Sequence, residues 1–196
     1  MQYGSGSTRA NPGETNKELW EHLDDVCSYL SMGSHWHRRT ANECRKLAGR
    51  GFGRWHEEEG LGDYTSLSEL CKILMDKLDY APAIDVSMLD AAEKFAMNSL
   101  NDFKAHFGLW QDSESKLVVC LNHAIHESRA VDIELYEYVC CVAREVQNER
   151  MRARMGYDRL ELGGWNGHDI GVVNMVLHEY FEKHHKQGEM IDFNLG

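Results

Sequence analysis

The sequence predicts an all-α domain built as a bundle of long amphipathic helices. Apolar residues recur at three- and four-residue spacing over most of the chain, which is the period of one helix face. Only two prolines, Pro12 and Pro82, occur among 196 residues, and proline is costly inside a helix. No segment shows the strict alternation of apolar and polar residues that favours a strand. Together these observations favour a helical bundle.

Three segments make up the predicted domain organisation. Residues 1–14 are polar and rich in Gly and Ser, and we expect a flexible N-terminal arm there. Residues 15–187 form the helical bundle, and residues 188–196 form a C-terminal tail. The first helix begins near Asn16. We place a break near Arg38–Thr40, because Thr40-Ala41-Asn42-Glu43 fits the capping box that begins a helix.

The second helix crosses a stretch with five glycines between Gly49 and Gly62. Two interpretations remain open at this point: the helix breaks, or the small residues let another helix approach closely. Pro82 then ends the helix. Further helices are predicted at about 87–110 and 115–154, separated by a turn at 111–115. A short fifth helix is predicted at about 168–186.

The net charge and the cysteines indicate which partners the protein does not bind and in which compartment it occurs. The net charge of −11 argues against direct binding to nucleic acid. No apolar run reaches about 18 residues, so no membrane partner is expected. The six cysteines contain no C-x-x-C pair and sit mostly among apolar residues. We interpret them as small hydrophobic residues in a reducing compartment and predict a cytoplasmic protein.

Ionisable residues on or beside the apolar helix faces are the candidate functional residues, because a buried charge is costly unless it is paired or binds a metal. The candidate metal ligands are His37, His56, Glu59, Glu93, His123 and Glu127. Carboxylates and imidazoles donated by several helices suit iron, with zinc or manganese as alternatives. Each residue also has a plainer interpretation. His37 could be a hydrogen-bonded core histidine, and Glu93 a solvated flank residue. The pair His123 and Glu127 could be an i, i+4 surface contact, and residues 56–59 an acidic helix face.

Two short motifs resemble the first two helices of ferritins. Residues 28–32 read Ser-Tyr-Leu-Ser-Met and residues 55–59 read Trp-His-Glu-Glu-Glu; ferritins carry a Y-L-S-M stretch on the first helix and an H-E-E stretch on the second at nearly this separation. His35-Trp36 and the stretch 52–56 are similar to motifs of the Dps-like miniferritins. The similarity covers about residues 16–80.

This resemblance implies a ferritin-like four-helix bundle of long helices plus a short C-terminal fifth helix. It also implies an iron site, di-iron or mononuclear, at which Fe(II) is oxidised by dioxygen or peroxide for iron storage or detoxification. The chain would then assemble with itself, as a shell of roughly 12 or 24 subunits. The chain departs from the family where Gly62 stands in place of the second-helix histidine, and where His123-x-x-x-Glu127 stands in place of E-x-x-H.

Two other functions fit the same residues. A bundle of this kind can host a di-metal oxidase that acts on an organic substrate, in a pocket lined by Trp55, Phe95 and Phe103. Alternatively, the chain is a non-enzymatic acidic interaction module that binds a basic partner. Exposure of Glu59 and Glu127 would favour the module, and their burial would favour a metal site.

Overall fold

The computed structural model describes residues 16–47, 50–89 and 100–163. Four long helices account for most of these residues: α1 (Lys17–Leu47), α2 (Arg50–Leu78), α4 (Leu100–Ser128) and α5 (Ile133–Gly163). No strand occurs in these three ranges, so the prediction of an all-helical fold is confirmed there. The N-terminal arm, the predicted fifth helix at 168–186 and the tail at 188–196 lie outside the described residues.

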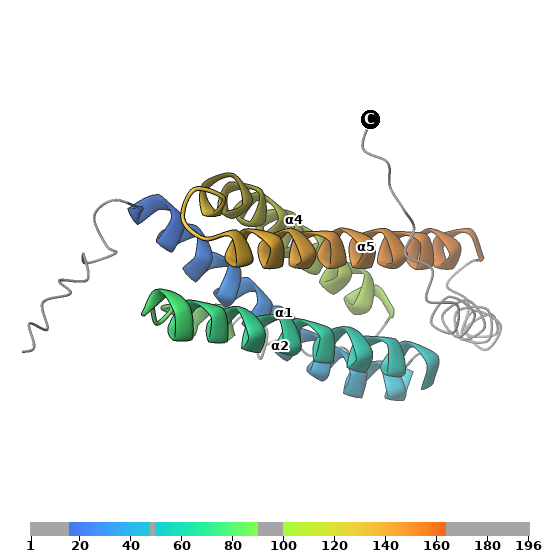
Figure 1. Cartoon of the computed structure of the whole chain (residues 1–196). Helices are drawn as coiled ribbons and strands as arrows, with labels where there is room; N and C mark the ends of the chain where they lie inside the picture. Colours follow the sequence, from blue (N-terminus) through green and yellow to red (C-terminus); the bar gives the residue numbers. More distant parts are fainter. Residues whose placement is uncertain (1–15, 48–49, 90–99, 164–196) are drawn as a thin grey trace, which may run out of the picture.

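The helices pack as two antiparallel pairs, α1 with α2 and α4 with α5 (Figure 1). Helix α1 also contacts α4, and α2 contacts α5. Both cross-pair contacts are antiparallel: His22 near the start of α1 stacks on His123 near the end of α4, and Lys77 near the end of α2 pairs with Glu134 at the start of α5. Each helix therefore runs opposite to both of its neighbours.

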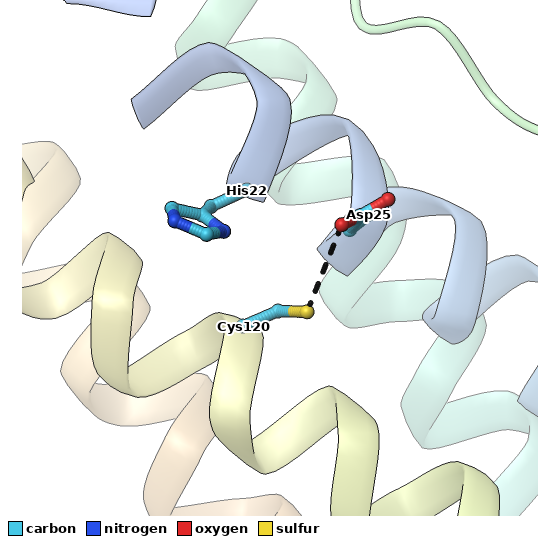
Figure 2. Close-up of side chains that lie close together, drawn as sticks. All are labelled: His22, Asp25 and Cys120. Atoms are coloured by element: carbon cyan, nitrogen blue, oxygen red, sulfur yellow. Dashed lines mark hydrogen bonds between the residues drawn. The ribbon is translucent and has the colours of Figure 1, made fainter. Parts of the chain in front are cut away.

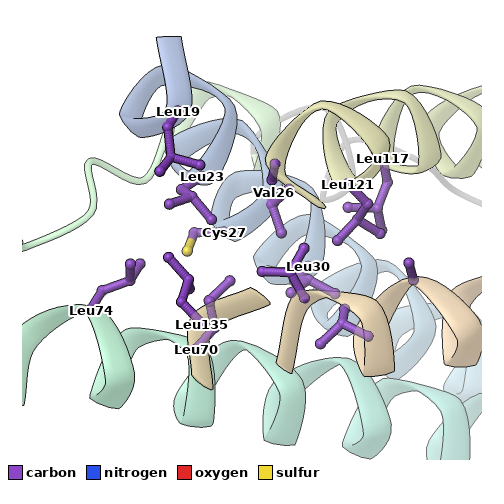
Figure 3. Packing of buried hydrophobic residues seen from close by; sticks show 14 of the residues in the cluster. Leu19, Leu23, Val26, Cys27, Leu30, Leu70, Leu74, Leu117, Leu121 and Leu135 are labelled. Carbon is purple, nitrogen blue, oxygen red and sulfur yellow. The ribbon is translucent and has the colours of Figure 1, made fainter. Parts of the chain in front are cut away.

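An apolar core fills one part of the space between the helices (Figure 3). Leu23, Leu70, Leu121 and Leu135, one from each helix, are completely buried. Burying a leucine side chain contributes about 1.5–3 kcal/mol. The core is made of Leu19, Trp20, Leu23, Val26, Cys27, Leu30, Leu70, Leu74, Leu117, Leu121, Ala124, Leu135, Val139, Val142, Ala143 and Val146.

A second, aromatic cluster packs farther along the same helices. Trp36, Trp55, Phe107 and Trp110 are buried together, with Met32 against them. Trp36 and Trp110 stack with ring centroids 5.5 Å apart and an interplanar angle of 10°. These rings join α1, α2 and α4 at a distance from the leucine-rich core.

The chain after α2 is held along α1. Asp79 ends α2 in the left-handed conformation, with φ of 55°. The carboxylate oxygen Oδ1 of Asp24 then accepts two hydrogen bonds of 2.8 Å, from the Tyr80 hydroxyl and from the Ala83 amide. Trp20 stacks on the Tyr80 ring at 4.5 Å. The start of the long connection between the two helix pairs is thereby fixed to α1.

The predicted helix break at Arg38–Thr40 is wrong. Helix α1 continues to Leu47, and Thr40 and Ala41 are each only 1% exposed. A capping box describes only the local hydrogen bonds of a helix start. At this position the same residues lie in a packed helix interior, so burial decides the conformation.

The predicted turn at 111–115 is also wrong, and the true turn lies at 129–132. Ser115 donates to the Gln111 carbonyl at 2.8 Å, a bond that a serine makes inside a continuous helix. Asp132 caps α5 by accepting from the Leu135 amide at 2.9 Å. The predicted helix at 115–154 is therefore divided between α4 and α5. The predicted helix at 87–110 is described only at its ends, Ser87–Leu89 and the first turns of α4.

Helix α2 runs unbroken from Arg50 through its glycines. At Gly60 an added Cβ would lie 2.9 Å from the His37 Cβ and 3.2 Å from the Ser34 carbonyl oxygen. The Ser34 hydroxyl donates to the Gly60 carbonyl at 2.9 Å. Gly62 has open space around it. Of the two interpretations, close approach holds at Gly60, where α1 comes too near for a side chain.

Two expectations from composition concern the membrane and the cysteines. None of the helices within the described ranges is both long and apolar enough to cross a membrane.

Among the cysteines whose environment is described, only Cys27 is fully buried, whereas Cys141 is exposed. The interpretation as a buried hydrophobic residue therefore holds for Cys27 and fails for Cys141.

Candidate functional site

Five buried ionisable side chains from all four described helices gather beside the aromatic cluster. We call them the buried cluster: His37 of α1, His56 and Asp63 of α2, Glu114 of α4 and Glu149 of α5. Each is at most 5% exposed. Such groups are costly to bury unless hydrogen bonds, protons or a cation compensate them. Their convergence therefore marks this place as the candidate site.

The two histidines and Glu149 form a chain of contacts. The Nδ1 atoms of His37 and His56 are 2.8 Å apart, so one of them donates and the other accepts. On its other side, His37 Nε2 lies 2.9 Å from Glu149 Oε1. This second contact is an ion-pair distance and not a hydrogen bond, because His37 Nε2 and Glu149 Oε1 both lack a hydrogen-bond partner among the described residues.

Tryptophans surround the imidazoles. The His37 ring lies edge-on to Trp36, Trp55 and Trp110, with centroids 4.8, 5.9 and 5.5 Å away. The Trp55 indole donates to Glu59 Oε1 at 2.8 Å, which ties Glu59 to the edge of the buried cluster. The aromatic shell lowers the local dielectric, and this strengthens every charge interaction inside it.

The carboxyl groups of Asp63 and Glu114 have strongly raised pKa values. Burial is the main cause for Asp63, followed by the negative charges of Glu149, Glu114, Glu59 and Glu145. Burial also raises the pKa of Glu114, with Glu149 adding to the effect and Arg150 opposing it. Asp63 Oδ2 and Glu114 Oε2 are buried and accept no hydrogen bond from any residue that the structure describes. Protons or a cation would relieve this concentration of negative charge.

Glycine makes room for Asp63. A Cβ atom at Gly33 on α1 would clash with Asp63 Oδ2, so the carboxylate of α2 lies directly against the α1 backbone. Asp63 is thus directed inward between the helices and not toward solvent.

A cleft of about 630 Å³ between α2 and α5 leads to the buried cluster. Asp63 and Glu149 contribute to its lining, together with four further glutamates. These are Glu58, Glu59, Glu69 and Glu145. A cleft lined by one sign of charge focuses its field and concentrates counter-ions, here cations.

The six sequence-predicted ligands do not form one site. His37, His56 and Glu59 come together at the buried cluster. His123 is exposed and lies nine residues beyond Glu114 on α4, a distance of about 13 Å along the helix. Glu127 lies one turn farther on, so neither joins the site. Glu93 is outside the described residues.

Asp63, Glu114 and Glu149 were missed, although their spacing is a usable signal. Glu149 continues a series of buried residues at three- and four-residue steps, and Glu114 stands inside another. On α5 the series is Leu135, Val139, Val142, Val146 and Glu149; on α4 it is Phe107, Trp110, Glu114, Leu117 and Leu121. A carboxylate in phase with such a stripe is directed into the interior. Because a turn was predicted at 111–115, Glu114 was not assigned to a helix, and its place in the buried series was missed.

A second group of potential ligands lies between α1 and α4, near the start of α1 (Figure 2). One ligand atom from each of His22, Asp25 and Cys120 lies within 4.8 Å of the other two. The Cys120 thiol contacts Asp25 Oδ2 at 3.9 Å. Within the described part of the chain, no other three such side chains are gathered this closely.

No protein-family model matches the chain, and no curated protein matches it. Function is therefore inferred from the geometry of these two groups of side chains.

Proposed function

We propose that the buried cluster binds iron and that the chain oxidises Fe(II) there with dioxygen or peroxide, for iron storage or detoxification. The observation that carries this proposal is the pair of buried acids Asp63 and Glu114. Each has one buried oxygen without a hydrogen-bond partner among the described residues, and each is repelled by Glu149, which contacts the buried His37. Fe(II) is the substrate: it gives up one electron to the oxidant. The residues of the chain supply ligands, charge and a dry environment.

The donor set fits iron. Three carboxylates and two imidazoles are ligands that suit Fe, Mn and Zn in helical bundles. The ligand atoms of the buried cluster are spread more widely than those of His22, Asp25 and Cys120. A cation would replace the repulsion among Asp63, Glu114 and Glu149 with attraction and would draw these side chains together.

The order of the helices supports the same proposal. Two antiparallel pairs joined by one long connection are the arrangement of ferritin-like folds, which build metal sites from inward-facing side chains of all four helices. Here α1 contributes His37, α2 contributes His56 and Asp63, α4 contributes Glu114 and α5 contributes Glu149. The acidic cleft between α2 and α5 would attract Fe(II) and lead it to Asp63 and Glu149.

A di-metal oxidase that acts on an organic substrate is the second candidate. The cleft of about 630 Å³ beside the buried cluster favours it, since this volume suits a small molecule. The lining differs from the one predicted. Trp55 is buried in the aromatic cluster, and the side chains of Phe95 and Phe103 are not described. The acidic interaction module is favoured less, because Glu59 and Glu127 are both partly buried.

Anaerobic titration with Fe(II), followed by exposure to oxygen, tests the site. Wild type is compared with an Asp63→Asn/Glu114→Gln double variant. Loss of a residue that merely supports a metal site typically costs 10–100-fold in affinity or activity. The double variant is therefore expected to oxidise iron at least about tenfold more slowly. Equal oxidation by both proteins would overturn the proposal.

One control sharpens this experiment. Glu127→Gln removes a sequence-predicted ligand that lies away from the buried cluster, and this variant is expected to oxidise iron at the wild-type rate. Repeated additions of Fe(II) then separate the candidates: continued uptake supports storage, and arrest once the site is filled supports the oxidase.

Self-assembly into a hollow shell is part of the ferritin-like proposal. A shell would elute from a sizing column at several hundred kilodaltons, against 22.5 kDa for the single chain. Elution as a monomer or dimer would remove storage from the proposal and leave the oxidase.

A further inference from the structure

Two pairs of potential ligands face each other across the contact between α1 and α4. His22 and Asp25 are three residues apart on α1, and Cys120 and His123 are three residues apart on α4. Residues at this spacing lie on the same face of a helix. Figure 2 shows His22 and Asp25 on α1 across from Cys120 on α4, with a dashed line joining Asp25 to Cys120. The His22 and His123 rings stack at 4.6 Å with an interplanar angle of 11°.

We propose that His22, Asp25 and Cys120 bind a zinc ion that clamps α1 to α4, with His123 as the fourth ligand. This site is separate from the iron site proposed above and does not depend on it. It lies near the start of α1, whereas the buried cluster lies near the other end of that helix.

The geometry needs little change to accept zinc. Ligand atoms of His22, Asp25 and Cys120 already lie within 4.8 Å of one another. Zinc bonds of about 2.0–2.3 Å in a tetrahedron place ligand atoms about 3.4 Å apart, so each atom must move by roughly 1 Å. His123 is not among the gathered atoms; it is exposed, and its ring must rotate out of the stack on His22 before a ring nitrogen can bind the same metal.

The donor types select zinc over Fe(II). A thiolate and imidazoles are soft or borderline ligands, and one thiolate, two imidazoles and one carboxylate make a four-coordinate zinc set. The buried cluster has no sulfur ligand and three carboxylates, so the two sites favour different metals. A closed set of four protein ligands is typical of a structural zinc site and not of a catalytic one.

Zinc replaces a proton at Cys120. In the metal-free protein the Cys120 thiol contacts Asp25 Oδ2 at 3.9 Å. On binding, the S–H bond breaks, the sulfur keeps the electron pair and binds zinc, and the proton goes to solvent. Asp25 then faces a dication instead of a thiol.

Cobalt(II) provides the test, because a thiolate bound to Co(II) gives a charge-transfer band in the near ultraviolet. The reduced full-length protein is titrated with Co(II), and zinc is then added. Wild type is expected to show the band at about one cobalt per chain and to lose it when zinc displaces the cobalt. Absence of the band in wild type would overturn the proposal.

Ligand variants and matched controls locate the metal. Cys120→Ser is expected to abolish the band, and Asp25→Asn and His123→Ala are each expected to weaken cobalt binding by about tenfold or more. Cys140→Ser and His126→Ala are the matched controls and are expected to keep it. Asp25 is exposed, so Asp25→Asn tests the site in a chain whose packing is intact. A band that survives in Cys120→Ser would place the metal elsewhere.

The two proposed metal sites can fail independently. The Asp63→Asn/Glu114→Gln variant is expected to keep the cobalt band, because it retains all four residues of the α1–α4 site. Cys120→Ser is expected to keep the oxidation of Fe(II). A variant that abolishes both signals would contradict the separation of the two sites.

Discussion

The apolar core and the buried cluster occupy two parts of the same four helices and use the same helical period. In the core, each helix presents leucine or valine to its neighbours, and apolar burial stabilises the fold. At the buried cluster, the same inward-facing positions carry His37, Asp63, Glu114 and Glu149. The difference shows that one part of the interior provides stability through apolar burial, whereas the other buries ionisable side chains at a cost in stability.

Truncation in the apolar core is expected to have the largest effect on stability. Leu70 is completely buried, so Leu70→Ala should lower the free energy of unfolding by about 2–5 kcal/mol. Urea denaturation followed by circular dichroism measures it. The exposed Leu61 on the same helix is the control, and Leu61→Ala should change stability by less than about 0.5 kcal/mol. Similar losses from both substitutions would contradict the assignment of the core.

The close approach of α1 and α2 is expected to give the next effect. A methyl group at Gly60 would collide with His37 Cβ and the Ser34 carbonyl, so Gly60→Ala should lower the free energy of unfolding by about 1–3 kcal/mol. Gly62→Ala, two residues later in open space, should instead raise it by up to about 1 kcal/mol through helix propensity. Opposite signs in thermal denaturation would support the close approach, and equal signs would contradict it.

The buried cluster should respond in the opposite direction to the core. Asp63→Asn removes a buried acid that is repelled by its neighbours. In metal-free protein at about pH 8, the substitution should raise the free energy of unfolding by about 1–3 kcal/mol. Chemical denaturation with a chelator present measures this gain. A loss of stability similar to that of Leu70→Ala would mean that Asp63 is part of the stabilising interior.

The smallest expected effect is the pH dependence of the stability gained by Asp63→Asn. The pKa values of Asp63 and Glu114 are raised in the folded protein, whereas in the unfolded chain they are near 4. Between these limits the folded state holds more protons, so the contribution of both groups to stability falls as pH rises through the raised pKa values. The advantage of Asp63→Asn over wild type should therefore grow from about pH 5 to about pH 8. A constant difference would contradict the raised pKa of Asp63.

Local sequence pattern was sufficient for the helical class and for several inward-facing residues. His37 was placed among the ionisable residues on or beside apolar helix faces, and it is completely buried, in phase with the buried Leu23 and Leu30 of the same helix. Turns were predicted less well. Asp112 and the serines at 113 and 115 looked like a turn, yet no glycine or proline interrupts the helix there, and it continues. Helix boundaries depend on what each segment packs against, and local sequence does not contain this information.

The sequence by itself determined that the chain is helical and that histidines and carboxylates lie in phase with apolar stripes, because helical period is a property of neighbouring residues. Only the tertiary structure decided which helices face each other and which of their residues lie at the same position along the bundle. His37 and His56 lie beside Asp63, Glu114 and Glu149, whereas His123 lies farther along the bundle. The tertiary structure also brings Cys120 to His22 and Asp25. The physical reason is that the relative register of two packed helices depends on side-chain contacts between distant segments, which no single segment specifies.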